Sequence, residues 1–171
     1  MVHAINVSSG GVPKHPVLFA RLSATGVEGD RQRNTRLHGG PDRAVSLYSL
    51  DLIEALRIER HPIEPGSTGE NLTIADLDWA MVVPGVRLTV GEALVEITSY
   101  AHPCRNIDAS FVEGQITRIS VKVHPGWSRV YARVLREGLV RPGDAVELLP
   151  RDGTPNGAAT TASLRSSASR R

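Results

Sequence analysis

The chain has 171 residues, of which 40% are hydrophobic, 22% are charged and only 4% are aromatic. This length predicts one domain around one hydrophobic core, and a core built from Val, Leu, Ile and Ala favours strands. The formal net charge of +2 comes from residues 151–171, where four arginines face one aspartate, so residues 1–150 are slightly negative. A domain that binds nucleic acid usually carries positive charge on its folded part, so we expect no nucleic-acid binding.

Cys104 is the one cysteine of the sequence. A single thiol excludes an internal disulfide, and it excludes an iron–sulfur cluster or a cysteine-rich zinc site held by this chain alone. The sequence shows no secretory signal pattern and no apolar run near the ~20 residues that a membrane span needs. We therefore expect a cytoplasmic protein without a membrane segment.

In the first half of the chain, apolar alternation and Gly/Pro turns predict short strands. Residues 2–7 are expected to form a strand, followed by a Ser/Gly turn that places Lys14 in a loop. Residues 16–30 are expected to continue as a second strand that breaks at Gly26, and residues 30–42 as a long polar loop.

The middle of the chain predicts one helix between strands. Residues 44–49 are expected to form a strand, and residues 50–60 a helix that Pro62 and Pro65 end. A glycine-rich loop over residues 65–74 follows. Residues 86–90 and 93–99 then flank Gly91-Glu92, which is typical of a β-hairpin.

After the hairpin, residues 105–123 are expected to form an irregular helix, and residues 129–138 and 145–149 the last strands. Many short strands separated by Gly and Pro indicate a mainly β fold, a closed barrel with a few short helices, over residues 1–150. Residues 151–171 are rich in Ser, Ala and Arg with little to bury, so we expect a disordered tail.

Cys104 lies just beyond a predicted strand, where a rigid scaffold leads into a loop, which is a common position for reactive residues. A thiolate is both a nucleophile and a soft metal ligand. A lone cysteine is also often a small buried hydrophobic residue, and residue type alone leaves both readings open.

The polar segment that begins at Gly26 and ends at Arg43 combines glycines, arginines and His38. Glycine lets backbone N–H groups approach an anion, and arginine binds phosphate through a planar fork. A turn-rich loop with solvated charges explains the same residues equally well. The phosphate-loop, dinucleotide-binding, HExxH and GxSxG patterns are all absent, so neither nucleotide binding by those motifs, nor a zinc site, nor a serine hydrolase is supported.

Several segments together resemble the MOSC family, named after the C-terminal domain of molybdenum cofactor sulfurases. These segments are GGVPK at 10–14, GVEGD at 26–30, HGGPDRAV at 38–45, Tyr48, PGSTGENLTI at 65–74, PGVRLTVGEALVEIT at 84–98, PC at 103–104 and VYARVLREGLVRPGD at 130–144. The resemblance runs in order from about Gly10 to Leu149. It implies a β-barrel that binds the molybdenum cofactor, a molybdopterin.

The resemblance also implies roles for individual residues. Cys104 corresponds to the family's cysteine, which carries sulfur or coordinates molybdenum. The candidates for holding the pterin and its phosphate are Lys14, Arg36, His38, Gly39, Gly40, Arg43 and Asn71, and Asp30 and Tyr48 are expected to line the same pocket. His102 departs from the apolar residue or proline that the family often has there.

Two functions follow from this resemblance. Stand-alone bacterial members are similar to reductases of N-hydroxylated compounds, so we expect an oxidoreductase in which Cys104 binds molybdenum. Because one cysteine cannot hold an iron–sulfur cluster, electrons would come from a separate reductase or ferredoxin-type partner. The alternative is a sulfur carrier, in which a Cys104 persulfide passes sulfur to a cofactor or a metal–sulfur cluster.

Overall fold

The structure is a computed structural model that describes residues 1–31 and 40–150. It is mainly β, as predicted, with one α-helix, α2 (Leu50–Ile58), among the described residues. The strands are β1 (Val2–Val7), β2 (His15–Val17), β3 (Ala20–Ser23), β4 (Gly26–Val27), β5 (Val45–Ser49), β6 (Leu72–Ile74), β7 (Arg87–Val90), β8 (Ala93–Tyr100), β9 (Val130–Arg136), β10 (Gly138–Val140) and β11 (Val146–Leu149). Short 3-10 helices are η1 (Pro41–Arg43), η2 (Trp79–Met81), η3 (Arg105–Ser110), η4 (Val112–Gly114) and η5 (Ile116–Ile119).

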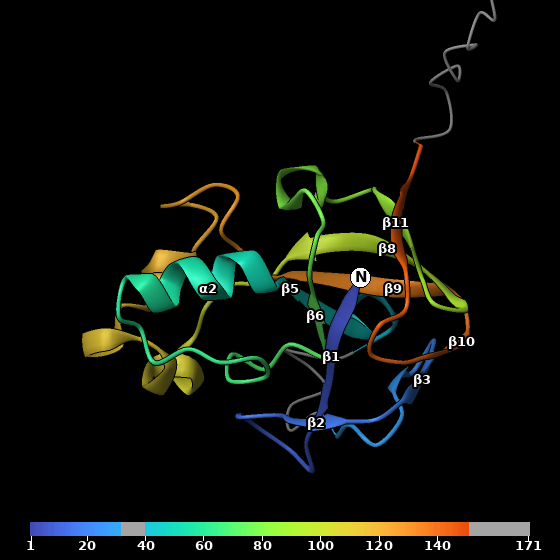
Figure 1. Cartoon of the computed structure of the whole chain (residues 1–171), viewed down its shortest axis with the longest axis horizontal. Helices are drawn as coiled ribbons and strands as arrows, with labels where there is room; N and C mark the ends of the chain where they lie inside the picture. Colours follow the sequence, from blue (N-terminus) through green and yellow to red (C-terminus); the bar gives the residue numbers. More distant parts are fainter. Residues whose placement is uncertain (32–39, 151–171) are drawn as a thin grey trace, which may run out of the picture.

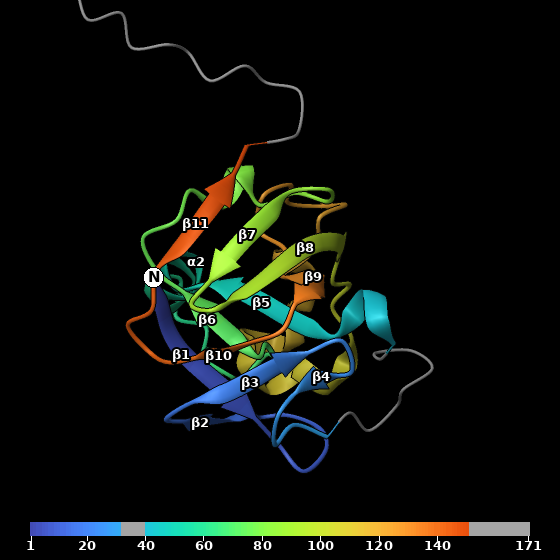
Figure 2. The same ribbon diagram turned by 90° about the vertical axis from the view of Figure 1, so that its right-hand side faces the viewer.

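Eight strands form one sheet in the order β11-β7-β8-β9-β5-β6-β1-β2, and a second sheet has the order β10-β3-β4 (Figure 2). All pairings are antiparallel except that of β5 with β6. The large sheet curves so that β1 meets the turn before β11, where the Val2 N–H donates to the Asp144 carbonyl and the Gly143 N–H donates to the Val2 carbonyl, both at 2.8 Å. Within residues 1–31 and 40–150 no strand pairing closes this sheet, so the closed barrel stays a prediction.

The expected second strand is divided between the two sheets. β2 pairs with β1 in the large sheet, whereas β3 pairs with β10 in the small one. The chain crosses between them at Leu18 and Phe19, whose side chains are exposed. Gly26, where a break was expected, begins β4 instead. The prediction of one continuous strand was wrong because the apolar run hides this change of sheet.

The predicted helix is confirmed as α2. Ser49 caps it, since its Oγ accepts a hydrogen bond from the Leu52 N–H at 3.3 Å, and such a cap satisfies a free donor of the first turn. Ile53 and Leu56 face the core and are fully buried. The hairpin of β7 and β8 is also confirmed, with Val90 opposite Ala93 across its turn.

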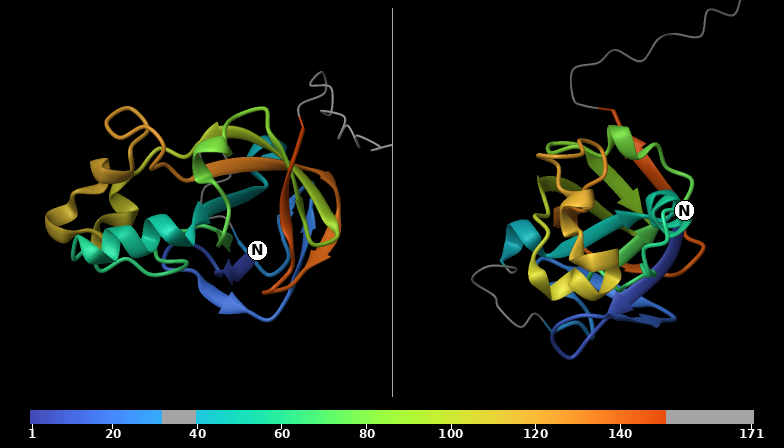
Figure 3. Two further views of the ribbon diagram at one scale, coloured as in Figure 1. Left: turned by 45° about the horizontal axis from the view of Figure 1, so that its top comes forward. Right: turned by 90° about the vertical axis from the view of Figure 1, so that its left-hand side faces the viewer.

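Where one irregular helix was expected over residues 105–123, the structure has three separate 3-10 helices, η3, η4 and η5, the last of which ends at Ile119. This segment lies beside α2 at one end of the molecule (Figures 1 and 3). The Val112 N–H donates to His61 Nδ1 at 3.1 Å, and Arg118 forms two hydrogen bonds with the carboxylate of Glu59. These contacts join the two segments into a helical end.

None of the described helices has the length and hydropathy of a membrane span. β11 ends at Leu149, and the predicted tail 151–171 lies outside the described residues.

Candidate active site around Cys104

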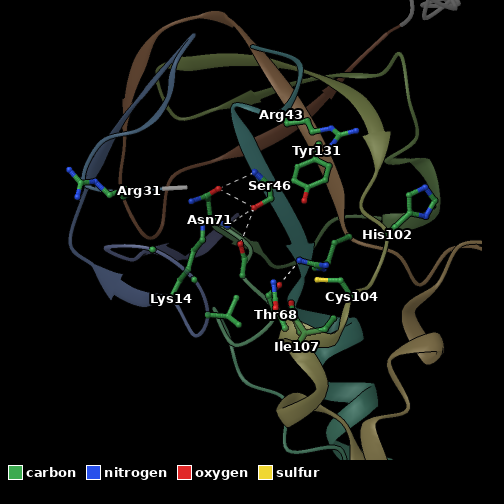
Figure 4. A pocket seen from close by; sticks show the side chains of 16 residues that line it. Lys14, Arg31, Arg43, Ser46, Thr68, Asn71, His102, Cys104, Ile107 and Tyr131 are labelled. Atoms are coloured by element: carbon green, nitrogen blue, oxygen red, sulfur yellow. Dashed lines mark hydrogen bonds between the residues drawn. The ribbon is translucent and has the colours of Figure 1, made fainter. Parts of the chain in front are cut away.

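A cavity of about 570 Å³ lies between the strands and the helical end. This volume is within the range of small-molecule and cofactor pockets. Figure 4 shows the side chains that surround it. The lining residues are Gly10, Gly11, Val12, Lys14, Arg31, Arg43, Ser46, Thr68, Gly69, Asn71, His102, Cys104, Asn106, Ile107, Arg129 and Tyr131.

Cys104 lies where the chain leaves β8 and enters η3, as its position after a predicted strand implied. The Ala101 N–H donates to the Arg129 carbonyl at 2.8 Å, which holds the end of β8 against the start of β9. Cys104 then precedes η3, and its carbonyl accepts from the Ile107 N–H at 3.1 Å. Its side chain is half-buried and points into the cavity (Figure 4), so a ligand in the cavity can reach the thiol.

Lys14 and Asn71, both predicted site residues, meet at the carboxylate of Asp30. Lys14 Nζ donates to Asp30 Oδ2 at 2.6 Å, and Asn71 Nδ2 donates to the same oxygen at 2.9 Å. The second oxygen, Oδ1, accepts from the Ser8 N–H at 2.9 Å. Asp30 is not among the residues that line the cavity, but it fixes two that are.

The amide of Asn71 is fully used within the protein. Its Nδ2 also donates to the Asn6 carbonyl at 3.2 Å, and its Oδ1 accepts from the Ser46 backbone N–H and hydroxyl at 3.2 and 3.0 Å. Asn71 therefore ties the loop before β6 to β1 and β5. In this arrangement its amide holds the wall of the cavity in place.

Burial lowers the pKa of Lys14 from its ordinary value, although the adjacent Asp30 carboxylate favours the charged form. Desolvation disfavours an ammonium, and an opposite charge within hydrogen-bond distance offsets part of that cost. Lys14 is thus a buried donor already oriented by its partner.

The cavity lining is cationic. Lys14, Arg31, Arg43 and Arg129 contribute to it, and none of the described residues that line it is acidic. The Arg43 guanidinium lies over the ring of Tyr131, 5.6 Å from the ring centre, which is a cation–π distance. A wall of this kind favours an anionic ligand.

The burial of two charged residues was not predicted from the sequence. Arg129 is only 5% exposed and lies just before β9, and Glu70 is fully buried just before β6. Each precedes a run of apolar strand residues, where a charged side chain normally marks a solvated strand end. The sequence offered no local signal that both face inward.

The other predicted residues are placed as follows. Gly40 precedes η1 and is exposed, outside the cavity lining, so its cofactor contact stays a prediction. Arg36, His38 and Gly39 lie outside the described residues. Tyr48 is fully buried in the core, and its hydroxyl donates to the Trp127 carbonyl at 3.0 Å.

Tyr48 therefore does not line the cavity, and that expectation was wrong. Ser46 and Tyr48 lie on the same face of β5, but Tyr48 lies two residues further along the strand, where its ring packs against Trp79 and its hydroxyl reaches Trp127. Burial also raises the pKa of Tyr48.

Replacing Tyr48 with phenylalanine is expected to lower the free energy of unfolding by about 1–2 kcal/mol, because a buried carbonyl loses its donor. The same change should leave ligand binding in the cavity intact. Urea unfolding followed by circular dichroism measures the first effect. A loss of ligand binding in a fully folded Tyr48→Phe protein would show that Tyr48 contributes to the ligand site after all.

Comparison with known proteins identifies the family. The family model described as "MOSC domain" matches residues 34–147. YflK of Bacillus subtilis, described as uncharacterized, is 33% identical over 144 residues, which cover 82% of this chain and 64% of YflK. A protein of Gibberella moniliformis named "Reductase" is 33% identical over 136 residues, covering 75% of this chain and 23% of that protein. The chain thus spans less than two thirds of the length of these relatives.

Solved structures agree on the fold. The structure of YiiM from Escherichia coli is 25% identical with a TM-score of 0.64, covering 88% of this chain and 71% of that one. YiiM from Geobacillus stearothermophilus has a TM-score of 0.69 at 24% identity, covering 88% and 75%. Because the family model matches two thirds of the length of this chain, the chain belongs to the MOSC domain family.

Proposed function

We propose that this protein binds the molybdenum cofactor in the cavity around Cys104 and reduces N-hydroxylated compounds there. The observation that carries the proposal is the placement of the chain's single thiol on the wall of a cation-lined cavity. Membership of the MOSC family and the similarity to a protein named as a reductase support it.

The residues of the cavity fit the chemistry of this cofactor. A thiolate is a soft ligand that suits molybdenum, and the thiol of Cys104 would provide this ligand. The cofactor's phosphate needs cationic donors, and Lys14, Arg43 and Arg129 provide them. Arg129 Nε is buried without a hydrogen-bond partner among the described residues, as expected of a donor set completed by a ligand.

Each residue has a distinct task in this proposal. Cys104 would bind the metal through its sulfur. Lys14, held by Asp30, and Arg43, placed over Tyr131, would bind the anionic and pterin parts. Asn71 and Ser46 would keep the wall rigid through their mutual hydrogen bonds, since a site is effective only when its groups are preorganised.

When bound, the cofactor would supply a metal that changes oxidation state, taking electrons from the donor and passing them to the substrate for cleavage of its N–O bond. In the overall reaction the N–OH bond breaks, two electrons and two protons are consumed, and an N–H compound and water leave. With one thiol, this chain holds no iron–sulfur cluster of its own. We therefore also propose a separate reductase or ferredoxin-type electron donor, and the reducing cytoplasm as the compartment.

The test is reduction of N-hydroxylated compounds by protein made in a host that synthesises the cofactor. Chemically reduced viologen replaces the unknown donor, and the amine or amidine product is measured by chromatography. We expect product formation that depends on both cofactor and viologen. No product from molybdenum-loaded protein across N-hydroxylated bases, amidoximes and hydroxylamines would contradict the reductase activity.

The sulfur-carrier alternative uses the same accessible thiol. In it, Cys104 takes one sulfur atom from a cysteine desulfurase and the domain only delivers it. Mass spectrometry after incubation with a desulfurase and cysteine separates the two functions. A stable adduct of one sulfur atom on Cys104, together with no reductase activity, would favour the carrier.

A further inference from the structure

The mouth of the cavity is marked by those lining residues that are exposed to solvent. They are Gly10, Arg31, His102 and Asn106. Figure 4 shows Arg31 on one side of the cavity, and His102 and Cys104 on the other. Arg105 is also exposed and lies between Cys104 and Asn106 in the chain, both of which line the cavity. Two exposed arginines therefore border the mouth from opposite sides.

The backbone fixes the points from which these two side chains extend. The Arg31 N–H donates to the Ser8 carbonyl at 2.8 Å, which ties Arg31 to the end of β1. Arg105 is the first residue of η3, whose start is held by the hydrogen bond from the Ile107 N–H to the Cys104 carbonyl at 3.1 Å. Elements far apart in the sequence thus present positive charge at one rim.

The described part of the chain does not neutralise either arginine. Arg31 and Arg105 form no ion pair and no side-chain hydrogen bond with residues 1–31 and 40–150. Their charges are therefore available to opposite charges on a partner. Three exposed arginines elsewhere do have carboxylate partners: Arg21 pairs with Glu137, Arg57 with Glu54 and Glu64, and Arg133 with Asp42 and Glu96.

The proposed reaction requires a protein partner that comes close to this mouth. The reaction consumes two electrons, and one thiol cannot hold an iron–sulfur cluster that would relay them. Electron transfer between proteins weakens steeply with distance, so the redox centre of the donor has to approach the cavity into which Cys104 points. Weak electron-transfer complexes bury less than about 1,200 Å², and opposite charges speed their encounter. A small cationic rim is enough for such a complex.

We propose that Arg31 and Arg105 form the docking surface for an acidic, ferredoxin-type electron-carrier protein. The inference rests on the proposed function, because a carrier is needed only if a substrate is reduced at this site. Two reduced carriers dock in turn for each substrate molecule, and each is oxidised by one electron. With two protons from solvent, the N–OH group of the substrate becomes N–H and water.

The test measures docking without turnover, on cofactor-free protein from a host that cannot make the cofactor. An oxidised, acidic [2Fe–2S] ferredoxin is titrated in a calorimeter at ionic strengths of about 0.01 M and about 0.15 M, between which the Debye length falls from about 30 Å to about 8 Å. We expect binding that weakens as salt rises. Arg31→Glu together with Arg105→Glu should weaken binding at low salt at least about tenfold, because like charges then face each other.

Two control proteins separate local charge from other effects. Arg31→Lys together with Arg105→Lys keeps both charges and should bind like wild type, because steering depends on charge and not on the guanidinium fork. Arg60→Glu together with Arg141→Glu changes the net charge by the same amount as the rim variant. Arg60 and Arg141 are exposed and lie outside the cavity lining, so this variant should also bind like wild type. A basic cytochrome c in place of ferredoxin should not bind.

Alkylation of Cys104 locates the docked carrier, because Cys104 is the one cysteine of the sequence. Saturating ferredoxin at low salt should slow its reaction with iodoacetamide several-fold in wild type, and not in the variant with Arg31→Glu and Arg105→Glu. Each protein is compared with itself without ferredoxin, and mass spectrometry counts the modified chains.

Three results overturn the inference. They are wild-type protein that does not bind ferredoxin at low salt, a folded glutamate variant that binds as tightly as wild type, and binding that leaves the alkylation of Cys104 unchanged. Circular dichroism checks folding, and Arg31→Gln together with Arg105→Gln replaces the glutamate variant if that does not fold.

Failure of this inference is distinct from failure of the proposed function. Loaded protein that reduces substrate with viologen, but binds no ferredoxin without its cofactor, would refute the docking surface alone. A protein that never takes up molybdenum would refute the proposed function and leave the ferredoxin titration as an independent result.

Discussion

Replacing Cys104 with serine is expected to lower reductase activity by at least about 100-fold, since even residues that only orient a metal ligand cost 10- to 100-fold. Serine offers a hard hydroxyl in place of a soft thiolate at nearly the same size. The thiol is half-buried on the cavity wall and caps no helix donor, so the fold should be retained. Initial rates with viologen as donor, at equal concentrations of folded protein, measure the effect.

The matched control for this change is Val123→Ser, an exposed position in the same part of the chain and outside the cavity lining. It should retain wild-type rates. Full activity in Cys104→Ser would show that the thiol is no more than packing, and would contradict a metal ligand and a persulfide carrier alike.

Replacing Glu70 with glutamine is expected to lower the free energy of unfolding by about 3 kcal/mol or more, because a buried charged acceptor is lost. The Gly66 N–H and the Thr68 and Thr73 hydroxyls all donate to this carboxylate. Its negative charge also lies close enough to favour the charged form of Lys14. The change therefore weakens these hydrogen bonds and removes a negative charge that favours the charged form of Lys14.

Urea unfolding of cofactor-free protein measures this loss. Glu147→Gln on β11 is the matched control, because that side chain is exposed, and surface changes of this kind usually stay within about 0.5 kcal/mol. Equal urea midpoints for the two variants would contradict a stabilising role for the three hydrogen bonds that the Glu70 carboxylate accepts.

Local patterns in the sequence predicted most of the elements. The hairpin of β7 and β8 follows from strict alternation around Gly91, which has a φ of +53°. The helix α2 follows from apolar spacing and from Pro62 after its end. The crossing at Leu18 and Phe19 could not be predicted, because two short strands in different sheets form one apolar run.

The candidate site was only partly predictable for a related reason. Cys104, Lys14, Arg43 and Asn71 were expected at one site, and the structure places all four in the lining of one cavity. Arg129 joins them because Ala101 pairs with it across the ends of β8 and β9. That contact joins residues far apart in the chain, so no local sequence pattern predicts it.

The presence of the molybdenum cofactor is the central claim, and metal analysis tests it most directly. Protein purified from a cofactor-competent host, in which a known molybdenum enzyme is loaded in parallel, is analysed by mass spectrometry for molybdenum per chain. The account predicts close to one molybdenum per wild-type chain and little in Cys104→Ser. Wild-type protein without molybdenum, beside a fully loaded reference enzyme, would contradict it.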